Sequence, residues 1–483
     1  MLRSAAAFQN LILSPRLLPI LPTTTTTISR MSSSSESSPP VFHPVSSLDP
    51  DMFKEEEEHY ALTIKKQLTG KIMSSYKQLL LNKPKVRNVH TPASSPDLRV
   101  IVLSTLTSQG AASLDPSISK LISDSPDDDV KLSTHTVAST YSDMTVDSVL
   151  RRVIPESVTT EIPSSFESVG HIAHVNLREN VLPWKFIIGK VLLDKNHHIT
   201  KVVNKVGQIS TEFRTFPMEV IAGPDDNNFE VKLKEGGVQF CLDFEKVYWN
   251  SKLQYEHRRL VDRIAGVEHG GAHKKSEKRG DVASSNSTVV ADVMAGIGPF
   301  AIPLGATHKI KVLANDLNPV SFEYLKKNAK INKCEKHVEP YNMDGRAFIH
   351  KLGSEKTKFD HAIMNLPAIA VEFLDAFRGW DVEYCRPTVH VHCFVKNAED
   401  DEVVDFAKER CVNALGCKLS VEEDGFETHL VRDVAPKKPM LCVSFKLPHE
   451  LAKLEKVDLS NYKFGIRKGA ENDEPDVKRR KLN

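Results

Sequence analysis

The 483-residue sequence lacks the signatures of a disulfide-stapled, zinc-bound or membrane-spanning protein. Its seven cysteines are an odd number and form no CxxC pair. This pattern argues against a disulfide framework or a zinc site and favours reduced thiols in an intracellular compartment. No uncharged apolar run reaches the roughly 18 residues that a membrane-spanning helix needs. We therefore expect a soluble protein that uses no metal and no membrane.

The sequence also lacks an excess of either charge. Lys and Arg number 64 and Asp and Glu 63, which leaves a formal charge of +1. No net field draws such a chain onto nucleic acid or anionic lipid, so any such partner must be met by local patches. Hydrophobic (40%), charged (26%) and aromatic (7%) fractions are ordinary for globular protein. At roughly 100–200 residues per domain, the length predicts several domains.

The first 50 residues are typical of a targeting segment followed by a linker. Arg3, Arg16 and Arg30 occur with no acid before Glu36, which favours a mitochondrial transit peptide over an unstructured tail. Met31 could start a form without this segment, so dual localisation is expected.

The C-terminal tail, residues 449–483, contains the basic cluster Lys478–Lys481. Such a cluster fits a nuclear-import address, an RNA-touching tail or a solvated charged terminus. Together the two ends predict a protein of the mitochondrial matrix, nucleus and cytoplasm.

The region 51–160 is predicted to be a small α/β domain. The run Glu55–Glu58 is expected on a solvated helix face, followed by a helix around residues 63–82 and a strand at Leu98–Leu103.

The region 165–285 is predicted to be an α+β domain, ending in a Gly-, Ser- and Lys-rich insertion at 265–288. Short apolar runs separated by turn signals indicate its strands. The expected elements are strands at 172–175, 200–206, 218–222 and 236–244 and an amphipathic element at Lys185–Leu193.

The region 286–448 alternates strand and helix, which predicts an α/β fold with a parallel, doubly wound sheet. The expected strands are Thr288–Val293, Lys311–Ala314, Val338–Asn342 and Phe359–Met364, and the expected helices are Phe300–Gly305 and Ser321–Asn332. Three further strands, at Leu419–Val421, His429–Val431 and Met440–Leu447, are expected to close the sheet antiparallel.

Four polar residues fall where these strands should end: Asp292, Asp316, Asp344 and Asn365. Their separations of 24, 28 and 21 residues each match about one strand-plus-helix unit. All four should lie at the carboxyl edge of one sheet, where open α/β sheets bind ligands. A single Asp there could be only a helix cap, but four in register predict a shared ligand site.

The glycines Gly296 and Gly298 follow the first of these strands and allow a ligand to approach the backbone closely. The segment satisfies GxGxxA with Asp316 about 20 residues on, so a dinucleotide oxidoreductase is an alternative. However, Asp292 and two more residues separate strand from glycines. An acid after the second strand also suits ribose hydroxyls, and one after the third suits an adenine amino group. S-adenosylmethionine therefore fits better than NAD.

The tripeptide Asn365-Leu366-Pro367 resembles the N-x-P loops of methyltransferases that act on planar nitrogens. In such a loop an amide and a carbonyl grip the edge of a base. N-x-P alone is common in turns, and its place after the fourth strand favours a functional reading.

A longer set of motifs is similar to the tRNA (guanine-N1)-methyltransferases, which modify the purine 3′ of the anticodon at position 37. The resemblance covers roughly residues 165–448 and is carried, in order, by DFEKVYWNSKL, EHRRL, DVMAGIGPFAIPL, NDLNP, DGR and MNLPAIAVEFLDAF. It implies a class I (Rossmann-like) methyltransferase domain preceded by smaller α/β and α+β domains that hold the tRNA. The insertion at 265–288 departs from the compact form.

The resemblance also implies catalytic roles. Guanine N1 carries a weakly acidic proton, so methylation needs a base and a partner for charge on O6. Glu256 matches the general base and Arg214 the cation that steadies O6, while Asn365 and Pro367 shape the guanine slot. Without the resemblance, Glu256 could be a helix-surface partner of Arg259 and Arg214 a surface cation.

The same resemblance implies a cofactor site for S-adenosylmethionine. Asp316 would hold the ribose, Asp344 the adenine, and His257 and Asn365 would line the pocket. The full expected cofactor set is His257, Asp292, Gly296, Gly298, Asp316, Leu317, Asp344, Gly345 and Asn365. We expect a monomer that binds tRNA.

Two other functions remain open. A related transferase moves the aminocarboxypropyl group of the same cofactor onto tRNA, and Asn365-Leu366-Pro367 followed by Glu372-Phe373-Leu374 argues against it. A non-catalytic tRNA-binding protein would be expected only if Glu256 or the Asn365–Pro367 loop were degraded, and both are intact.

Overall fold

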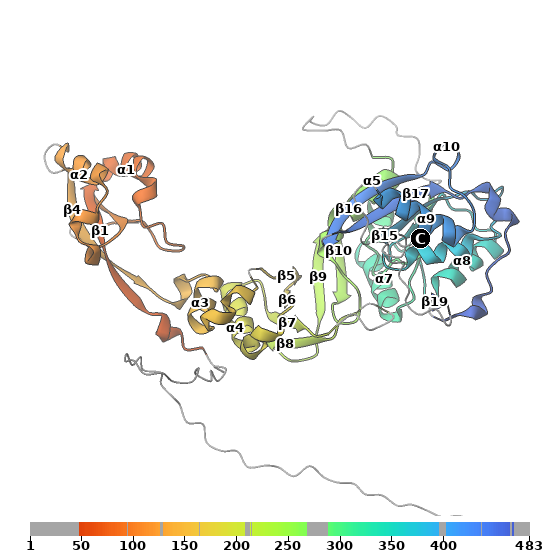
Figure 1. Ribbon diagram of the computed structural model, residues 1–483, viewed down its shortest axis with the longest axis horizontal. Helices are drawn as coiled ribbons and strands as arrows, with labels where there is room; N and C mark the ends of the chain where they lie inside the picture. Colours follow the sequence, from red (N-terminus) through yellow and green to blue (C-terminus); the bar gives the residue numbers. More distant parts are fainter. Residues whose placement is uncertain are drawn as a thin grey trace, which may run out of the picture. The chain divides into compact units, whose positions relative to one another are not determined.

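The computed structural model describes residues 48–93, 95–125, 129–163, 165–207, 213, 215–267, 288–395, 402–435, 437–463 and 466–467 (Figure 1). The targeting segment, most of the 265–288 insertion, the basic cluster Lys478–Lys481 and Arg214 lie outside these residues. Domain boundaries therefore stay predictions. Among the described helices, none is long and apolar enough to cross a membrane.

The N-terminal part is an antiparallel sheet with the order β2-β3-β1-β4. Its elements are β1 (Glu55–Lys65), α1 (Thr69–Ser75), β2 (Val89–His90), β3 (Leu98–Leu106), α2 (Pro116–Ser123) and β4 (Val130–Ser139). The predicted strand at Leu98–Leu103 is confirmed. The helix face at Glu55–Glu58 was wrong, and the helix around residues 63–82 is confirmed between 66 and 79, as α1 flanked by two 3-10 turns. Glu55–Glu58 instead begins β1, whose later residues Leu62 and Ile64 are buried in the core, so the strand's apolar half decided its conformation.

The next part is a mixed sheet with the order β5-β6-β7-β8 and two packed helices. Its elements are α3 (Val146–Val153), β5 (Glu167–Val169), β6 (Ile172–Val175), α4 (Lys185–Lys195), β7 (Lys201–Lys205) and β8 (Met218–Ala222). The parallel pair β6 and β7 is joined by α4, as a crossover requires. The predicted strands at 172–175, 200–206 and 218–222 are confirmed, and Lys185–Leu193 lies in helix α4.

A β-hairpin follows, of β9 (Glu230–Glu235) and β10 (Val238–Asp243). Gly236 and Gly237 form its two-residue turn with φ of 58° and 83°, a conformation that glycine adopts without strain. The sequence interpretation included β10 but missed β9, whose alternating Lys and Glu conceal its strand character. Val231 and Phe240 join the core of the next domain.

The C-terminal domain is a seven-stranded sheet with the order β13-β12-β11-β14-β15-β17-β16. The strands are β11 (Val289–Asp292), β12 (Lys311–Asn315), β13 (Val338–Tyr341), β14 (His361–Met364), β15 (Thr388–Phe394), β16 (Glu427–Ala435) and β17 (Lys438–Lys446). Strands β11 to β15 pair in parallel, and β17 runs antiparallel to both β15 and β16. The predicted α/β fold is confirmed.

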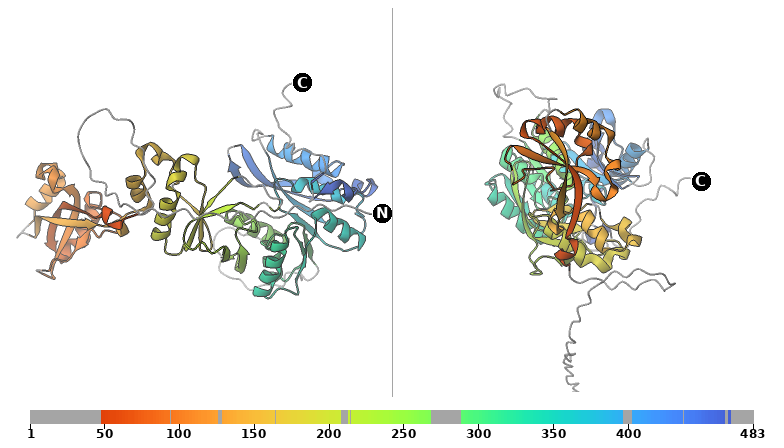
Figure 2. Two further views of the ribbon diagram at one scale, coloured as in Figure 1. Left: turned by 90° about the horizontal axis from the view of Figure 1, so that it is seen from below. Right: turned by 90° about the vertical axis from the view of Figure 1, so that its left-hand side faces the viewer.

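Helices cover both faces of this sheet (Figure 2). They are α5 (Gln254–Ile264), α6 (Ala301–Thr307), α7 (Pro319–Ile331), α8 (Gly345–Ser354), α9 (Val403–Leu415) and the short α10 (Val421–Asp424). Alternate strand residues belong to different cores: Val290 packs in the cluster that contains α7, and Ala291 in the one that contains α8. Two buried faces explain why these strands are continuously apolar.

Two details of this domain differ from expectation. The strand at Leu419–Val421 was wrong, because Ser420 caps α10 by accepting a hydrogen bond from the N–H of Glu423. The central strand β15 was missed, because its sequence TVHVHCF places two histidines among the apolar residues. The last described strands are the short β18 (Tyr462–Lys463) and β19 (Ile466–Arg467).

Candidate active site

A pocket opens at the carboxyl ends of β11, β12, β13 and β14, the edge where the sequence predicted a ligand site. Eight of the expected site residues line it: His257, Gly296, Asp316, Leu317, Asp344, Gly345, Asn365 and Pro367. The expectation that strand-end residues meet at one edge is therefore met by Asp316, Asp344 and Asn365. The structure leaves their individual roles as predictions.

The glycine loop after β11 meets two different steric demands. Gly296 lines the pocket with φ of 56°, and a Cβ built there would have open space. Gly298, outside the lining, has φ of 99°, and a Cβ there would lie 2.6 Å from Cγ1 of Ile302 and 2.9 Å from Cδ1 of Leu325. Gly296 thus serves the loop's shape at the pocket, and Gly298 allows helix α6 to pack closely.

Asp316 ties the end of β12 to the glycine loop. Its Oδ2 accepts a hydrogen bond from the N–H of Gly296 at 2.8 Å, and its Oδ1 accepts one from the N–H of Asn318 at 2.9 Å. Burial raises the pKa of Asp316 to about 6, against the effect of these two bonds. A carboxylate poised in this way can accept hydrogen bonds from ligand hydroxyls.

Asp344 and Asn365 offer the pocket unused acceptors. Oδ1 of Asp344 caps α8 by accepting from the N–H groups of Arg346 and Ala347. Oδ2 of Asp344 and Oδ1 of Asn365 are buried and make no hydrogen bond within the described part of the chain. Because buried polar atoms are normally satisfied, two such oxygens in one pocket favour a polar ligand there.

Aromatic rings form one wall of the pocket. The rings of Trp249 and Phe300 flank His257 at centroid distances of 6.2 and 5.0 Å. The Nδ1 of His257 lies 2.6 Å from Oε1 of the buried Glu235, which fixes the orientation of the imidazole. The sequence interpretation missed Trp249, Phe300 and Glu235 as parts of this wall.

The adenosyl moiety of S-adenosylmethionine fits this chemistry. Its ribose hydroxyls suit Asp316, its exocyclic amino group suits the free Oδ2 of Asp344, and the faces of its adenine ring suit the largely apolar lining.

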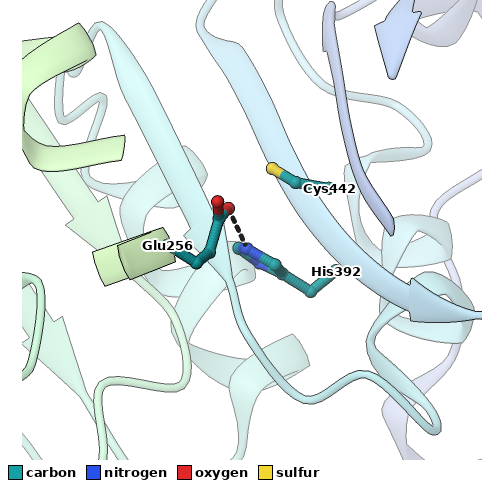
Figure 3. A group of neighbouring side chains, drawn as sticks. All are labelled: Glu256, His392 and Cys442. Carbon is teal, nitrogen blue, oxygen red and sulfur yellow. Dashed lines mark hydrogen bonds and ion pairs between the residues drawn. The ribbon is translucent and has the colours of Figure 1, made fainter. Parts of the chain in front are cut away.

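Glu256 is buried beside the pocket and is absent from its described lining. Nε and Nη2 of Arg259 donate to its two carboxylate oxygens at 2.6 and 2.8 Å, and Nε2 of His392 on β15 donates to Oε1 at 2.7 Å (Figure 3). Burial would raise the pKa of Glu256, but the bonds from Arg259 and His392 outweigh it and hold that pKa far below its usual range. The alternative interpretation of Glu256, as a partner of Arg259 on the same helix, therefore also describes a contact that the structure contains.

The sulfur of Cys442 completes a compact group with Glu256 and His392, and one ligand-type atom from each lies within 4.8 Å of the others (Figure 3). Such spacing is compatible with a metal ion. However, the guanidinium of Arg259 already occupies both oxygens of Glu256. The geometry therefore favours an ion-pair network over a metal centre.

Asp292 lies at the end of β11 but outside the described lining of the pocket. Its side chain is fully buried, and neither carboxylate oxygen makes a hydrogen bond to a described residue. Burial, with a smaller contribution from the charge of Asp316, raises the pKa of Asp292 to about 8. Asp292 is therefore a mainly protonated group beneath the glycine loop at neutral pH.

The loop Asn365–Pro367 is anchored to β15. The carbonyl of Pro367 accepts a hydrogen bond from the N–H of Phe394 at 3.0 Å, and Phe394 lines the pocket. This bond holds the amide of Asn365 at the pocket, as a base-binding loop requires.

Sheet order and pocket together define the chain as a class I methyltransferase. A family model described as the TRM5/TYW2 methyltransferase domain matches residues 231–419, and one described as the TYW2 N-terminal domain matches residues 146–226. A crystal structure of Trm5b from Pyrococcus abyssi has the same fold, with a TM-score of 0.54 over 80% of this chain and 99% of that one, at 21% identity.

Curated relatives are more similar in sequence. A protein of Phaeodactylum tricornutum named tRNA (guanine(37)-N(1))-methyltransferase 1 is 44% identical, with 90% of this chain and 94% of that protein covered. The human protein named tRNA (guanine(37)-N(1))-methyltransferase is 34% identical over 90% of this chain and 81% of its own length. The chain belongs to the tRNA (guanine(37)-N1)-methyltransferase family.

Proposed function

We propose that the protein transfers the methyl group of S-adenosylmethionine to N1 of guanosine 37 in tRNA. The observation that carries the proposal is the pocket at the sheet edge, where Asp316, Asp344 and Asn365 present acceptors in a chain of this family. When bound, the sulfonium of the cofactor supplies an electrophilic methyl group.

Different residues of the pocket bind the cofactor and the guanine. Asp316 and Asp344 hold the ribose and adenine, and Asn365 with the carbonyl-anchored Pro367 grips the edge of the guanine. The target base must be splayed out of the anticodon loop to reach this slot.

The proton on guanine N1 passes to an oxygen of Glu256. The N1 electron pair freed in this way forms the bond to the methyl carbon, while the carbon–sulfur bond breaks and its electrons remain on sulfur. Arg214 steadies the charge that accumulates on O6 of guanine. The remaining requirement is alignment of N1 with the methyl carbon.

The test is a methylation assay. The purified full chain is incubated with methyl-labelled S-adenosylmethionine and an unmodified tRNA transcript carrying guanosine 37, with an adenosine 37 transcript as the matched control. N1-methylguanosine from the first transcript alone is the expected product. Mass spectrometry separates the methyl from the larger aminocarboxypropyl adduct, and absence of any adduct with intact tRNA would leave only a binding role.

We also propose that the protein acts as a monomer without a metal. Because no step above needs a Lewis acid, chelator-treated protein should keep its full turnover. Light scattering on the pure protein should give the mass of one chain, and activity that requires added divalent cation would contradict the proposal.

The proposed compartments are the mitochondrial matrix, nucleus and cytoplasm. The support is the acid-poor segment with Arg3 and Arg16, the second methionine Met31 and the basic Lys478–Lys481 cluster. Imaging of the full-length chain, a form starting at Met31 and a form without the basic cluster would assign each compartment. Mitochondrial signal from the Met31 form would contradict the role of the first 30 residues.

A further inference from the structure

The carboxylate of Glu256 is held one layer below the surface of the pocket. Phe300 and Phe394 both line the pocket. The ring of His392 lies 6.0 Å from that of Phe300, and His392 precedes Phe394 by two residues on the same face of β15. His392 is fully buried and Glu256 only 2% exposed. The imidazole and its bound carboxylate are therefore buried next to the aromatic rings that line the pocket.

We propose that His392 is a positioning residue which, together with Arg259, holds Glu256 ionised and beneath the pocket in the free protein, so that guanine binding must draw the carboxylate away. The inference rests on the proposed function, in which Glu256 is the base. It adds a resting state of that base and the residues that maintain it.

The charged groups around Glu256 support a resting state in which its carboxylate is ionised and bound to Arg259 and His392. The titratable groups around the Glu256 carboxylate come from four elements: Arg259 on α5, His392 on β15, His429 on β16 and Cys442 on β17. The charge of His392 also lowers the pKa of Asp292 at the end of β11, against the effect of burial. Burial opposes the protonation of His392, but Cys442 and Glu256 raise its pKa to about 10.

An imidazolium and a guanidinium thus share one carboxylate. A carboxylate in this state is a weak proton acceptor, because a general base works best when its pKa lies near the working pH. Glu256 can act on guanine N1 only after it has left at least one of the two cations.

The experiment measures kcat/KM for tRNA between pH 5 and 8.5 with S-adenosylmethionine saturating, because the pH dependence of kcat/KM reports groups of the free enzyme. The acid limb is the fall of kcat/KM at low pH that accompanies protonation of Glu256. In the wild type this fall should occur below pH 5. His392→Gln keeps an N–H donor but removes the positive charge, so burial is opposed by Arg259 alone and the acid limb should rise into the measured range.

A second variant guards against misfolding at the fully buried His392. Arg259→Gln removes the other cation, and the side chain of Arg259 is 15% exposed, so the change is easier to accommodate. Its acid limb should move in the same direction. Arg259 donates directly to both carboxylate oxygens of Glu256, so a shift in this variant supports the assignment of the limb to Glu256.

The matched control is His390→Gln. His390 lies on the same strand and is equally buried, but its partners are Ser444 and His361 rather than Glu256. Its acid limb should stay where the wild type has it, with unfolding midpoint and cofactor affinity as checks on each variant. Acid limbs unchanged from wild type in folded His392→Gln and Arg259→Gln would overturn the inference. Failure of the proposed function shows separately, as a wild-type protein that makes no N1-methylguanosine.

Discussion

Two buried carboxyl groups of this protein have pKa values that are shifted in opposite directions. Glu256 is surrounded by the donors of Arg259 and His392, which lower its pKa despite burial. Asp292 is equally buried but lacks hydrogen bonds from described residues, and its pKa rises to about 8. The sign of the shift follows from the partners, because burial alone always disfavours the charged form of an acid.

The first prediction concerns Glu256→Gln. The amide keeps the shape of the side chain but cannot take the N1 proton, so kcat should fall by about 10²–10⁴-fold. Single-turnover methylation measures this fall, and S-adenosylmethionine affinity should stay unchanged because Glu256 lies outside the pocket lining. The matched control is Asp262→Asn on the same helix, which should keep wild-type turnover. Unchanged turnover in Glu256→Gln would refute the base assignment without affecting the fold.

Arg214→Ala separates catalysis from tRNA binding. If Arg214 steadies O6, kcat at saturating tRNA should fall by about 10²–10³-fold. A phosphate contact would instead lower tRNA affinity and flatten its salt dependence while kcat is retained. Single-turnover rates and binding isotherms on the same preparation distinguish the two.

Asp292 should make the ligand-free protein less stable as the pH rises. Its pKa is about 8 in the folded protein against 3.8 for an ordinary aspartate. Between these values the unfolded chain has lost the proton that the folded protein keeps, so stability falls with rising pH by about 1 kcal/mol per pH unit. Below about pH 4 the contribution is constant. Asp292→Asn should flatten this dependence in urea unfolding at pH 5 and 7.5, whereas exposed Glu323→Gln should not.

At the scale of elements, the strands and turns follow local sequence wherever a strand is apolar on both faces. Strands β11, β12 and β14 were predicted within a few residues because each is a short, mainly apolar run ended by a turn signal. Strands β1, β9 and β15 were misassigned or missed, because their acids, lysines and histidines are accommodated by neighbours that a single segment does not contain. His390, for example, is buried because Ser444 and His361 satisfy its two nitrogens.

The glycine loop gives a prediction at this scale. Gly298→Ala combines a positive φ with a Cβ that would lie 2.6 Å from Ile302, so it should lower stability by at least about 1–3 kcal/mol. Gly296→Ala has the unfavourable φ but open space, so its loss should be smaller. Thermal unfolding of the two variants compares them directly, and equal losses would show that packing against α6 is unimportant.

At the scale of the whole molecule, the near-zero net charge limits how the protein can hold tRNA. With 64 basic and 63 acidic residues, no general attraction to polyanions is available. Affinity must come from shape and from a few local phosphate contacts.

The corresponding prediction is a shallow salt dependence. The logarithm of the tRNA association constant should fall with the logarithm of salt by about 0.7 for each phosphate contact at the single-stranded loop. A few contacts give a slope far shallower than the value of about −10 of a strongly electrostatic binder. Titrations between 50 and 300 mM KCl, with a noncognate tRNA as control, measure the slope, and a steep slope would point to a basic surface that the net charge conceals.

The sequence alone determined the class of fold, the sheet edge that holds the ligand and the polar strand-end residues Asp316, Asp344 and Asn365 of the pocket. This was possible because strand ends in a parallel sheet are ordered by short, regular chain units, so that Asp316, Asp344 and Asn365 fall in register. Only the tertiary structure decided the state of Glu256. Its partner His392 lies 136 residues away on a strand that sequence patterns concealed, and the pKa of a buried carboxylate depends on which charges the fold brings beside it.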